Sequence, residues 1–561
     1  MQSNPAFTQS RSVFFKTRAT EHGIDVSRLL HPAKVIQNIL HYSMTHKALL
    51  PRINLIILLF LVGFSAAQAQ YSFDALRLSK QLPGQDPHSI ALGSSSAAQL
   101  QGFGSYVINP AVAAKMPAST FSLGLGVREI SQEATYIGQQ SSFSDSQTGI
   151  TNIGFSYKMP TVVGSLVFGG GYVQTADYNT AFNVEAFNDL TSRTYQFLTD
   201  YTNDIAFNTF AIDDFNNFQE SVFEYGGFQG VDQFAETTRR GQSGEYSIFM
   251  ATEFQPDFFL GVSLGIPVSK SVFEQVFIEY APLGVGGQPV YSGEENTGTY
   301  NIDRMLFEEK ITVDAIGYNA RVGLLYTGLN LLDFGISYTT GTRWNVEERF
   351  DTFIQTRFRN VVTLDGQVQT DGDGNTFGPQ LSDEISGEYS YNVKSPSRIH
   401  IGASTSSLPL FNISASAERV NYSNIRLSGF DSVDREVEID ENNFINRNFE
   451  DVWNFRAGAS LNIFDSIEPR IGWSYMPNPL AYLDNNDRHY LSAGIGIGIN
   501  QSTSIDLGIQ YGFWNTTEDL YYVDASTGII VDSANVPVTF IETADQDVDR
   551  FHATFGVTFR F

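Results

Sequence analysis

The chain of 561 residues contains no cysteine. It therefore forms no disulfide, and it has neither a thiolate metal ligand nor a cysteine nucleophile. Basic residues are also scarce, because 34 Lys and Arg stand against 61 Asp and Glu and give a formal net charge of −27. This excess of negative charge argues against nucleic acid as a partner.

Long hydrophobic runs are missing except for one, at residues 53–67. The run is too short for a membrane-spanning helix, which needs about 20 apolar residues. Lys47 and Arg52 precede it and Ala67-Gln68-Ala69 follows it, as in a secretory signal peptide with its cleavage site. Residues 44–69 are thus predicted to be a cleaved signal peptide, with the mature chain starting at Gln70; an uncleaved anchor is the alternative. Residues 1–43 are interpreted as an extension upstream of a true start at Met44, or else as part of a long signal.

Catalytic and cofactor motifs are absent: the sequence has no Gly-x-Ser-x-Gly, no His-Glu-x-x-His and no phosphate-binding loop. We therefore expect no enzyme, no cofactor and no metal site; a barrel lipase or protease assembled from separate strands is the alternative. Residues 371–375 (DGDGN) resemble a calcium loop, but Thr376 and Ser382 replace the expected glycine and acid. A turn in an acidic outer loop is the preferred interpretation over calcium binding at 371–383.

The last eleven residues, 551–561, place apolar side chains at every odd position and end on Phe561. Alternation with period two is typical of a strand that faces lipid on one side and the inside of a barrel on the other. A terminal aromatic resembles the sorting signal of bacterial outer-membrane barrels. This segment therefore predicts a transmembrane β-strand that the barrel-assembly machinery handles during biogenesis.

Fourteen segments share this outward apolar alternation, which predicts an all-β fold with a 14-stranded antiparallel transmembrane β-barrel. They are expected at about 119–128, 149–159, 163–176, 243–254, 258–281, 308–327, 331–347, 386–406, 410–427, 449–464, 467–482, 488–500, 503–516 and 549–561.

The connections between these segments alternate between short and long. Short turns of two or three residues, such as 160–162 and 255–257, alternate with long connections such as 129–148 and 282–307, as in bacterial barrels with short periplasmic turns and long outer loops. Residues 119–561 are therefore predicted to form a barrel in the bacterial outer membrane, with long extracellular loops at 177–242, 348–385 and 517–548. Only 483–487 is short for an outer loop. A soluble β-sandwich would not show this alternation.

The loop 177–242 is rich in Phe, Asn and Asp. Its apolar spacing suits short amphipathic helices, and we expect it to fold over the barrel mouth with most of its aromatics packed internally. Residues 70–118 lie between the mature start and the first strand and are rich in small side chains. A barrel of this size has a lumen that its own side chains do not fill, so these residues are predicted to form an N-terminal hatch. Glycines on inward positions leave room for it: Gly494, Gly496, Gly498, Gly508 and Gly512.

Several motifs resemble the FadL/TodX family of outer-membrane transporters for long-chain fatty acids and other hydrophobic compounds. They are Asn109-Pro110-Ala111 before the first strand, 395–402 (SPSRIHIG), 453–479 (WNFRAGASLNIFDSIEPRIGWSYMPNP), 487–494 and 505–511. The resemblance covers roughly 395–516, is thinner over 90–175, and does not extend into the long loops.

The resemblance implies a mechanism. A hatch closes the barrel, apolar outer loops capture the substrate, and hatch movement opens a route to a lateral gap where one strand bends inward. Consecutive glycines permit a bulge, so we place that gap at Gly169, Gly170 and Gly171, with Asn109, Pro110 and Ala111 acting as the hatch hinge beside it. A tight bend without an opening is the alternative.

Charged residues also fall on predicted inward faces. Because ionisable groups at membrane depth need partners or water, we expect them to pair with one another or with the hatch; an arginine among them suits a substrate carboxylate. They are Arg321, Arg398, His400, Glu418, Arg456, Arg470 and Asp506. The predicted function is transport of a hydrophobic small molecule by a monomer in outer-membrane lipid; a passive porin or a surface adhesin on the same barrel is the alternative.

Overall fold

The structure of the chain is a computed structural model. It describes residues 70–561 except 85, 216–217, 225–226, 288–289, 296–297, 360–362, 365–366, 369–379, 406–409, 431–434, 464–465, 484–485 and 533–534. The upstream extension, the signal peptide and the calcium-like stretch all lie outside the described residues. Among the helices that are described, none combines the length and the hydropathy needed to cross a bilayer.

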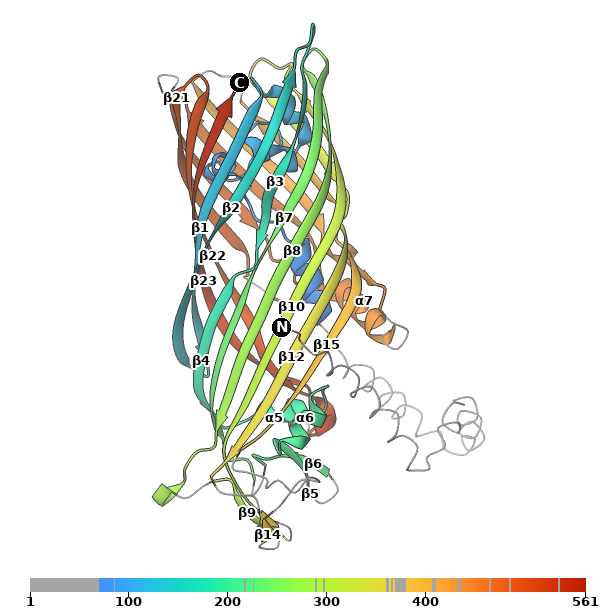
Figure 1. Cartoon of the computed structure of the whole chain (residues 1–561), viewed down its shortest axis with the longest axis vertical. Coiled ribbons are helices and arrows are strands. Elements are labelled where there is room, and N and C mark those ends of the chain that lie inside the picture. The colour runs from blue at the N-terminus through green and yellow to red at the C-terminus, as the bar shows by residue number, and fades with distance from the viewer. Residues whose placement is uncertain are drawn as a thin grey trace, which may run out of the picture. The chain divides into compact units, whose positions relative to one another are not determined.

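Residues 120–560 form a closed antiparallel β-barrel with fourteen staves, as predicted; each stave is one strand or two consecutive strands (Figure 1). Ten staves are single strands: β1 (Thr120–Tyr136), β2 (Gln139–Met159), β7 (Val231–Gln255), β8 (Phe258–Tyr280), β10 (Gly298–Tyr326), β19 (Asp451–Leu461), β20 (Ile467–Met476), β21 (Arg488–Asn500), β22 (Thr503–Val523) and β23 (Phe540–Arg560). Four are built from consecutive pieces: β3 (Leu166–Asp177) with β4 (Thr180–Asn188), β11 (Asp333–Thr339) with β12 (Arg343–Phe358), β15 (Gln380–Lys394) with β16 (Arg398–Ser404), and β17 (Phe411–Asn421) with β18 (Arg426–Ser428).

The two ends of the barrel sequence close the sheet. β1 pairs with β23 in register from Thr120↔Arg560 onward, and the amide of Phe561 donates to the Ser119 carbonyl at 3.1 Å. The Phe561 ring stacks on Phe155 of β2, with ring centroids 5.8 Å apart. The terminal aromatic therefore lies at the seam between the first and the last stave.

Several staves run far beyond the segments that apolar alternation predicted. β1 and β2 continue to a tight turn at Ile137 and Gly138, which both have positive φ, although 129–148 was expected to be a loop. The outward residues of this extension are polar, as at Glu129, while inward residues such as Ile130 stay buried. The strand therefore continues after its lipid-facing pattern has ended.

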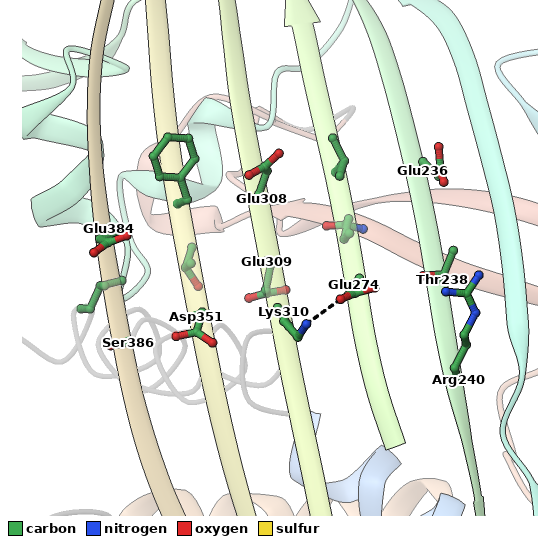
Figure 2. Close-up of a pocket in the computed structure, with 15 residues that line it drawn as sticks. Glu236, Thr238, Arg240, Glu274, Glu308, Glu309, Lys310, Asp351, Glu384 and Ser386 are labelled. Carbon is green, nitrogen blue, oxygen red and sulfur yellow. Dashed lines mark hydrogen bonds and ion pairs between the residues drawn. The ribbon is translucent and has the colours of Figure 1, made fainter. Parts of the chain in front are cut away.

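The outer face of the barrel carries an apolar belt and, beyond it, a charged band. Outward Leu260, Val262, Leu264 and Ile266 on β8 are between 36% and 61% exposed, as expected for side chains in lipid. Further along the same staves the outward side chains are mostly charged; Figure 2 shows Glu236, Glu274, Glu308, Lys310, Asp351 and Glu384 on neighbouring strands. Since unpaired charges at membrane depth are expensive, this part of β7–β15 stands outside the hydrocarbon.

The N-terminal segment, residues 70–118, folds inside the barrel as α3 (Gln70–Ser79), α4 (Pro87–Ala91) and the 3-10 helices η3 (Phe103–Val107) and η4 (Pro110–Lys115) (Figure 1). Inward glycines accommodate it closely. A Cβ on Gly335 of β11 would lie 1.8 Å from the Ala97 carbonyl oxygen, and one on Gly494 of β21 would lie 2.5 Å from the Ala91 side chain. Gly508 likewise faces Pro87, whereas Gly496 and Gly512 leave room for Arg470 and Tyr490 instead.

The extracellular half of the lumen is filled by a second layer. The helices α5 (Thr194–Phe197) and α6 (Asn203–Asn208) and the hairpin β5 (Ile212–Phe215) and β6 (Phe218–Ser221) follow β4. The buried Tyr195 and Phe197 of α5 and Phe223, which follows β6, belong to one apolar cluster with Phe277 of β8 and Tyr521 of β22. We call this cluster the cap layer. Internal packing of these aromatics was predicted for the loop 177–242.

Shorter elements complete the outer connections: β9 (Ser292–Glu295), β13 (Thr363–Leu364), β14 (Gln367–Val368) and the 3-10 helices η5 (Val285–Gly287), η6 (Tyr422–Asn424) and η7 (Ala525–Thr527). The helix α7 (Arg435–Asn448) connects β18 with β19. It packs on α3, where the buried Glu441 accepts a hydrogen bond from the Ser72 amide at 2.9 Å. Burial raises the Glu441 pKa to about 8.

Candidate functional site

The motif Asn109-Pro110-Ala111 attaches the N-terminal segment to the barrel wall. Asn109 caps η4, since its side-chain oxygen accepts from the Ala111 amide at 3.0 Å, while its Nδ2 donates to the carbonyls of Ala97 at 2.7 Å and Leu324 of β10 at 3.1 Å. A Cβ on Gly323 would lie 1.9 Å from the Asn109 oxygen. The motif therefore sits on β10 and also on β8, where a Cβ on Gly261 would lie 2.3 Å from the Ala111 amide nitrogen, whereas the sequence placed it beside the glycine run of the third stave.

The glycine run itself lies in an unbroken ladder. Gly169, Gly170 and Gly171 pair in register with β2 on one side and with β7 on the other. The side of Gly171 that faces the lumen is occupied by Phe103 of η3, whose ring would meet a Cβ there at 3.0 Å. The bulge predicted at the glycines is therefore not found there and lies further along the chain. The glycines instead make room for an aromatic ring of the N-terminal segment.

The ladder breaks just after the glycines. β2 and β3 pair only up to Asn152↔Val173, and the pairing of β3 with β7 shifts between Gln174 and Ala176. Beyond that point, among the described residues, β4 keeps its pairing with β7 but has no backbone ladder with residues 139–151 of β2.

The edge of β4 is held by side chains instead of a ladder. The Ser141 hydroxyl of β2 donates to the Asn183 carbonyl, and the Ala181 amide donates to the Gln132 side chain of β1. Because Gln132 belongs to the next stave but one, β4 has bent into the lumen across the inner face of β2. We call this region, between residues 139–151 and β4, the wall interruption.

A polar network lies behind the wall interruption. Asp177 forms ion pairs with Arg128 of β1, at 3.5 Å, and with Arg550 of β23, at 3.0 Å. Gln174 accepts from Arg128 and donates to Gln242 of β7 at 3.2 Å. These residues were not predicted from the sequence, although Arg128 and Arg550 occupy inward positions on two predicted strands, which was a usable signal.

A cavity of about 640 Å³ lies between the N-terminal segment and the wall interruption. Its lining includes Leu76 and Lys80 from α3 and the residue that follows it, and Asp177 and Tyr178 from the end of β3. Apolar side chains are numerous: Phe73, Leu82, Ile130, Phe273, Ile311, Val313, Leu480 and Trp514. Cationic side chains join them: Arg77, Arg128, Arg239, Arg488 and Arg550. Acidic side chains line it as well: Asp74, Glu129, Asp177, Glu309, Glu518 and Asp519. An apolar space bordered by charged groups can hold a ligand and orient it.

Lys80 is the one lysine among the described residues that line this cavity. Burial, together with the nearby Arg488 charge, lowers the Lys80 pKa to about 7. The side chain therefore changes charge near neutral pH. Deeper in the segment, burial raises the pKa of Asp86 to about 6, and Asp86 accepts hydrogen bonds from the amides of Ser89 and Gly104.

The charged residues predicted for the inner face all lie there in buried networks. Arg321 donates two hydrogen bonds to Glu245 of β7, at 2.6 and 2.7 Å. Glu418 lies between Arg398 and Arg456, with His400 beside it at 3.7 Å. Arg470 pairs with Asp506 and Glu468, and Arg398 also donates to the Ser79 carbonyl of the N-terminal segment. These charges connect staves to one another and to that segment, and none of the seven lines the cavity.

Metal binding has no candidate in the part of the chain that the structure describes, because no three His, Cys, Asp or Glu side chains are grouped to hold an ion there. The polar groups of the site are paired charges and amides around an apolar space. Such a site can hold an apolar molecule and orient a polar end.

Residues 261–531 match the family model described as outer membrane protein transport protein (OMPP1/FadL/TodX). This match confirms the resemblance stated from the sequence. The match begins in β8 and includes the stretch 395–516 but not 90–175. The protein is an outer-membrane β-barrel.

Solved structures of similar fold include a Pseudomonas aeruginosa FadL homologue, which is 12% identical with a TM-score of 0.51, over 86% of this chain and 99% of that one. The P. putida toluene transporter TodX is 14% identical with a TM-score of 0.48, over 86% of this chain and 99% of that one. The Ralstonia pickettii toluene transporter TbuX is 14% identical with a TM-score of 0.45, over 86% of this chain and 99% of that one. Comparison with curated protein sequences gives no match.

Proposed function

We propose that this protein transports hydrophobic compounds, of the long-chain fatty acid or hydrocarbon type, across the outer membrane. Residues 70–118 act as the hatch, and the compound leaves sideways through the wall interruption into the membrane. The observation that carries the proposal is the cavity, which has the hatch on one side and the interrupted wall on the other. The relatives described as toluene transporters have the same class of substrate.

The filled lumen favours this function over a passive porin. The cap layer and residues 70–118 occupy the barrel at two levels, and a porin needs a continuous aqueous channel. The proposal assigns no catalytic reaction to the chain. It includes export by cleavage before Gln70, insertion by the barrel-assembly machinery and action as a monomer.

Filling the wall interruption tests the exit. The inner side of Gly149 on β2 is open, since a Cβ there would meet nothing closer than Arg128 at 3.8 Å and Gln242 at 3.9 Å. Gly149→Phe is expected to fill this space and to lower uptake of radiolabelled oleate or toluene by about tenfold, while Gly149→Ala keeps the uptake of the wild type. Uptake by cells that make equal amounts of folded barrel measures the effect. Equal uptake for the Phe and Ala variants would reject lateral release at this place.

The charge of Lys80 predicts a pH dependence for carboxylate ligands. With a pKa of about 7, the protonated fraction of Lys80 falls by about tenfold between pH 6 and pH 8. Oleate affinity of the purified protein, measured by fluorescence competition, should fall by up to that factor, whereas toluene affinity should stay constant. Lys80→Met is the control and should remove the pH dependence. A wild-type oleate affinity that is flat from pH 6 to pH 8 would remove Lys80 from the ligand site.

A further inference from the structure

A groove of about 870 Å³ lies on the outer surface beside residues 477–483, which follow β20. Its floor is the lipid-facing side of the wall, where Ile401, Trp453 and Phe455 are between 41% and 45% exposed. Tyr475 at its edge stacks with Trp473 at 6.3 Å between ring centroids. Trp and Tyr gather where lipid meets water, so the groove opens at the outer boundary of the apolar belt.

The same residues separate this groove from the interior. Leu480 and Leu483 line the outer groove, and both also line the central cavity. Between these two spaces lies a small pocket of about 70 Å³, which these leucines line together with Lys80 and Trp514. The outer surface and the cavity are therefore divided at this place by residues 477–483, of which Leu480 and Leu483 line both spaces, and not by a strand of the barrel.

Few hydrogen bonds hold this partition in place. The ladder of β20 with β21 ends at Met476↔Arg488. Beyond it, residues 477–483 are tied to the chain after α7 through one isolated bridge, Leu480↔Phe449. Two bonds flank the bridge, from the Glu450 amide to the Pro479 carbonyl at 2.9 Å and from the Ala481 amide to the Asn448 carbonyl at 2.8 Å.

The charges around the groove select its occupant. The charged residues in its lining are Glu450, Asp451 and Asp487, and no lysine or arginine joins them among the described residues. Asp451 is paired with Arg419, and Asp487 accepts from the Tyr475 hydroxyl and the Asn478 amide. An anion finds no counter-charge in this groove and gains no binding free energy there. An uncharged apolar molecule gains about 25 cal/mol of binding free energy per Å² of buried surface.

We propose that residues 477–483 form an entry gate, at which an uncharged apolar molecule passes from the outer groove, between Leu480 and Leu483, into the central cavity. The cap layer packs on β8, β10 and β12 and on β22 and β23, and none of residues 477–483 belongs to it, so the gate gives the cavity an access that avoids the cap layer. The proposal rests on the transport function above and adds its point of entry. The gate would then be the entrance, and the wall interruption the exit, of one path through the cavity.

A disulfide lock tests the gate. Phe449 and Leu480 form a non-hydrogen-bonded antiparallel pair, because the two flanking bonds join the residues on either side of it. Cα atoms of such pairs are about 4.5 Å apart, which a disulfide spans. The chain has no other cysteine, so Phe449→Cys combined with Leu480→Cys gives one bond that can be oxidised and reduced in the same protein. Each single variant is a control that cannot be locked.

Uptake of radiolabelled toluene is expected to fall at least tenfold when the pair is oxidised and to recover on reduction, with no redox effect in the single variants. Equal uptake in both redox states, with the wild type active, overturns the gate and leaves the transport function standing. If the wild type itself takes up no toluene, transport of such compounds is refuted together with the gate.

Should the cysteine pair fail to fold, Leu483→Ala thins the partition and is expected to raise the initial rate of toluene uptake about threefold or more. An unchanged rate would overturn the gate. Oleate uptake at pH 8 should not rise in this variant; a rise as large as that for toluene would overturn the assignment to uncharged molecules.

Discussion

Replacing Gly335 with leucine is expected to displace the N-terminal segment and to turn a closed barrel into an ion-conducting one. A Cβ at this position of β11 would lie 1.8 Å from the Ala97 carbonyl oxygen. β11 is fixed by ladders to β10 and β16, so the segment must move and the wall cannot. Overpacking of this kind costs about 1–3 kcal/mol or more. Conductance in planar bilayers, which should be near background for the wild type, measures the opening.

The neighbouring Ile336 provides the matched control for this substitution. It is 49% exposed on the outward face of the same strand, so Ile336→Leu adds no contact with the segment and should leave conductance at background. Heat-modifiable migration on gels verifies that both barrels are folded. Background conductance of a folded Gly335→Leu barrel would mean that the segment does not depend on this contact for closure.

Arg321→Met is expected to destabilise the barrel by about 3–5 kcal/mol, because it leaves the Glu245 carboxylate buried without its counter-charge. Both side chains are only 1% exposed and share two hydrogen bonds. Glu245 would keep only neutral partners, the side-chain amide of Asn319 at 2.9 Å and the Ser247 hydroxyl. The urea midpoint of unfolding, followed by tryptophan fluorescence, measures the loss.

The double variant Glu245→Gln with Arg321→Met separates lost charge pairing from lost packing. It removes both charges, so most of the stability should return. A double variant as unstable as the single one would assign the loss to packing of the arginine stem. A single variant as stable as the wild type would show that water reaches Glu245.

The barrel could be predicted from sequence because lipid imposes a strict rule on outward side chains. In β8 the alternation Leu260, Val262, Leu264, Ile266 continues through the apolar belt, and the same pattern identified all fourteen staves. Their extensions could not be recognised in this way, since outside the membrane a strand needs no apolar outer face. Glu129 on β1 illustrates this: it is outward, exposed and still part of the strand.

The candidate site was predicted less well. Inward parity located the charged residues, but it does not say which charge meets which. Arg321 was selected without its partner Glu245, and Arg128 and Asp177 were not selected. The glycine run suggested a broken ladder, yet the break depends on how β4 crosses the inner face of β2, which is a tertiary event. Local sequence marks where a strand can bend and does not fix where it does.

The close fit between the N-terminal segment and the inward glycines also constrains the order of assembly. The glycines that contact this segment come from early staves, such as Gly154 of β2, and from the very last, Gly556 of β23. Their arrangement does not exist until β23 has joined β1. Residues 70–118 are synthesised before the barrel and are thus the part that must wait longest for its binding surface. Contacts so distant in sequence form slowly. The barrel must therefore close before the N-terminal segment can seal its lumen.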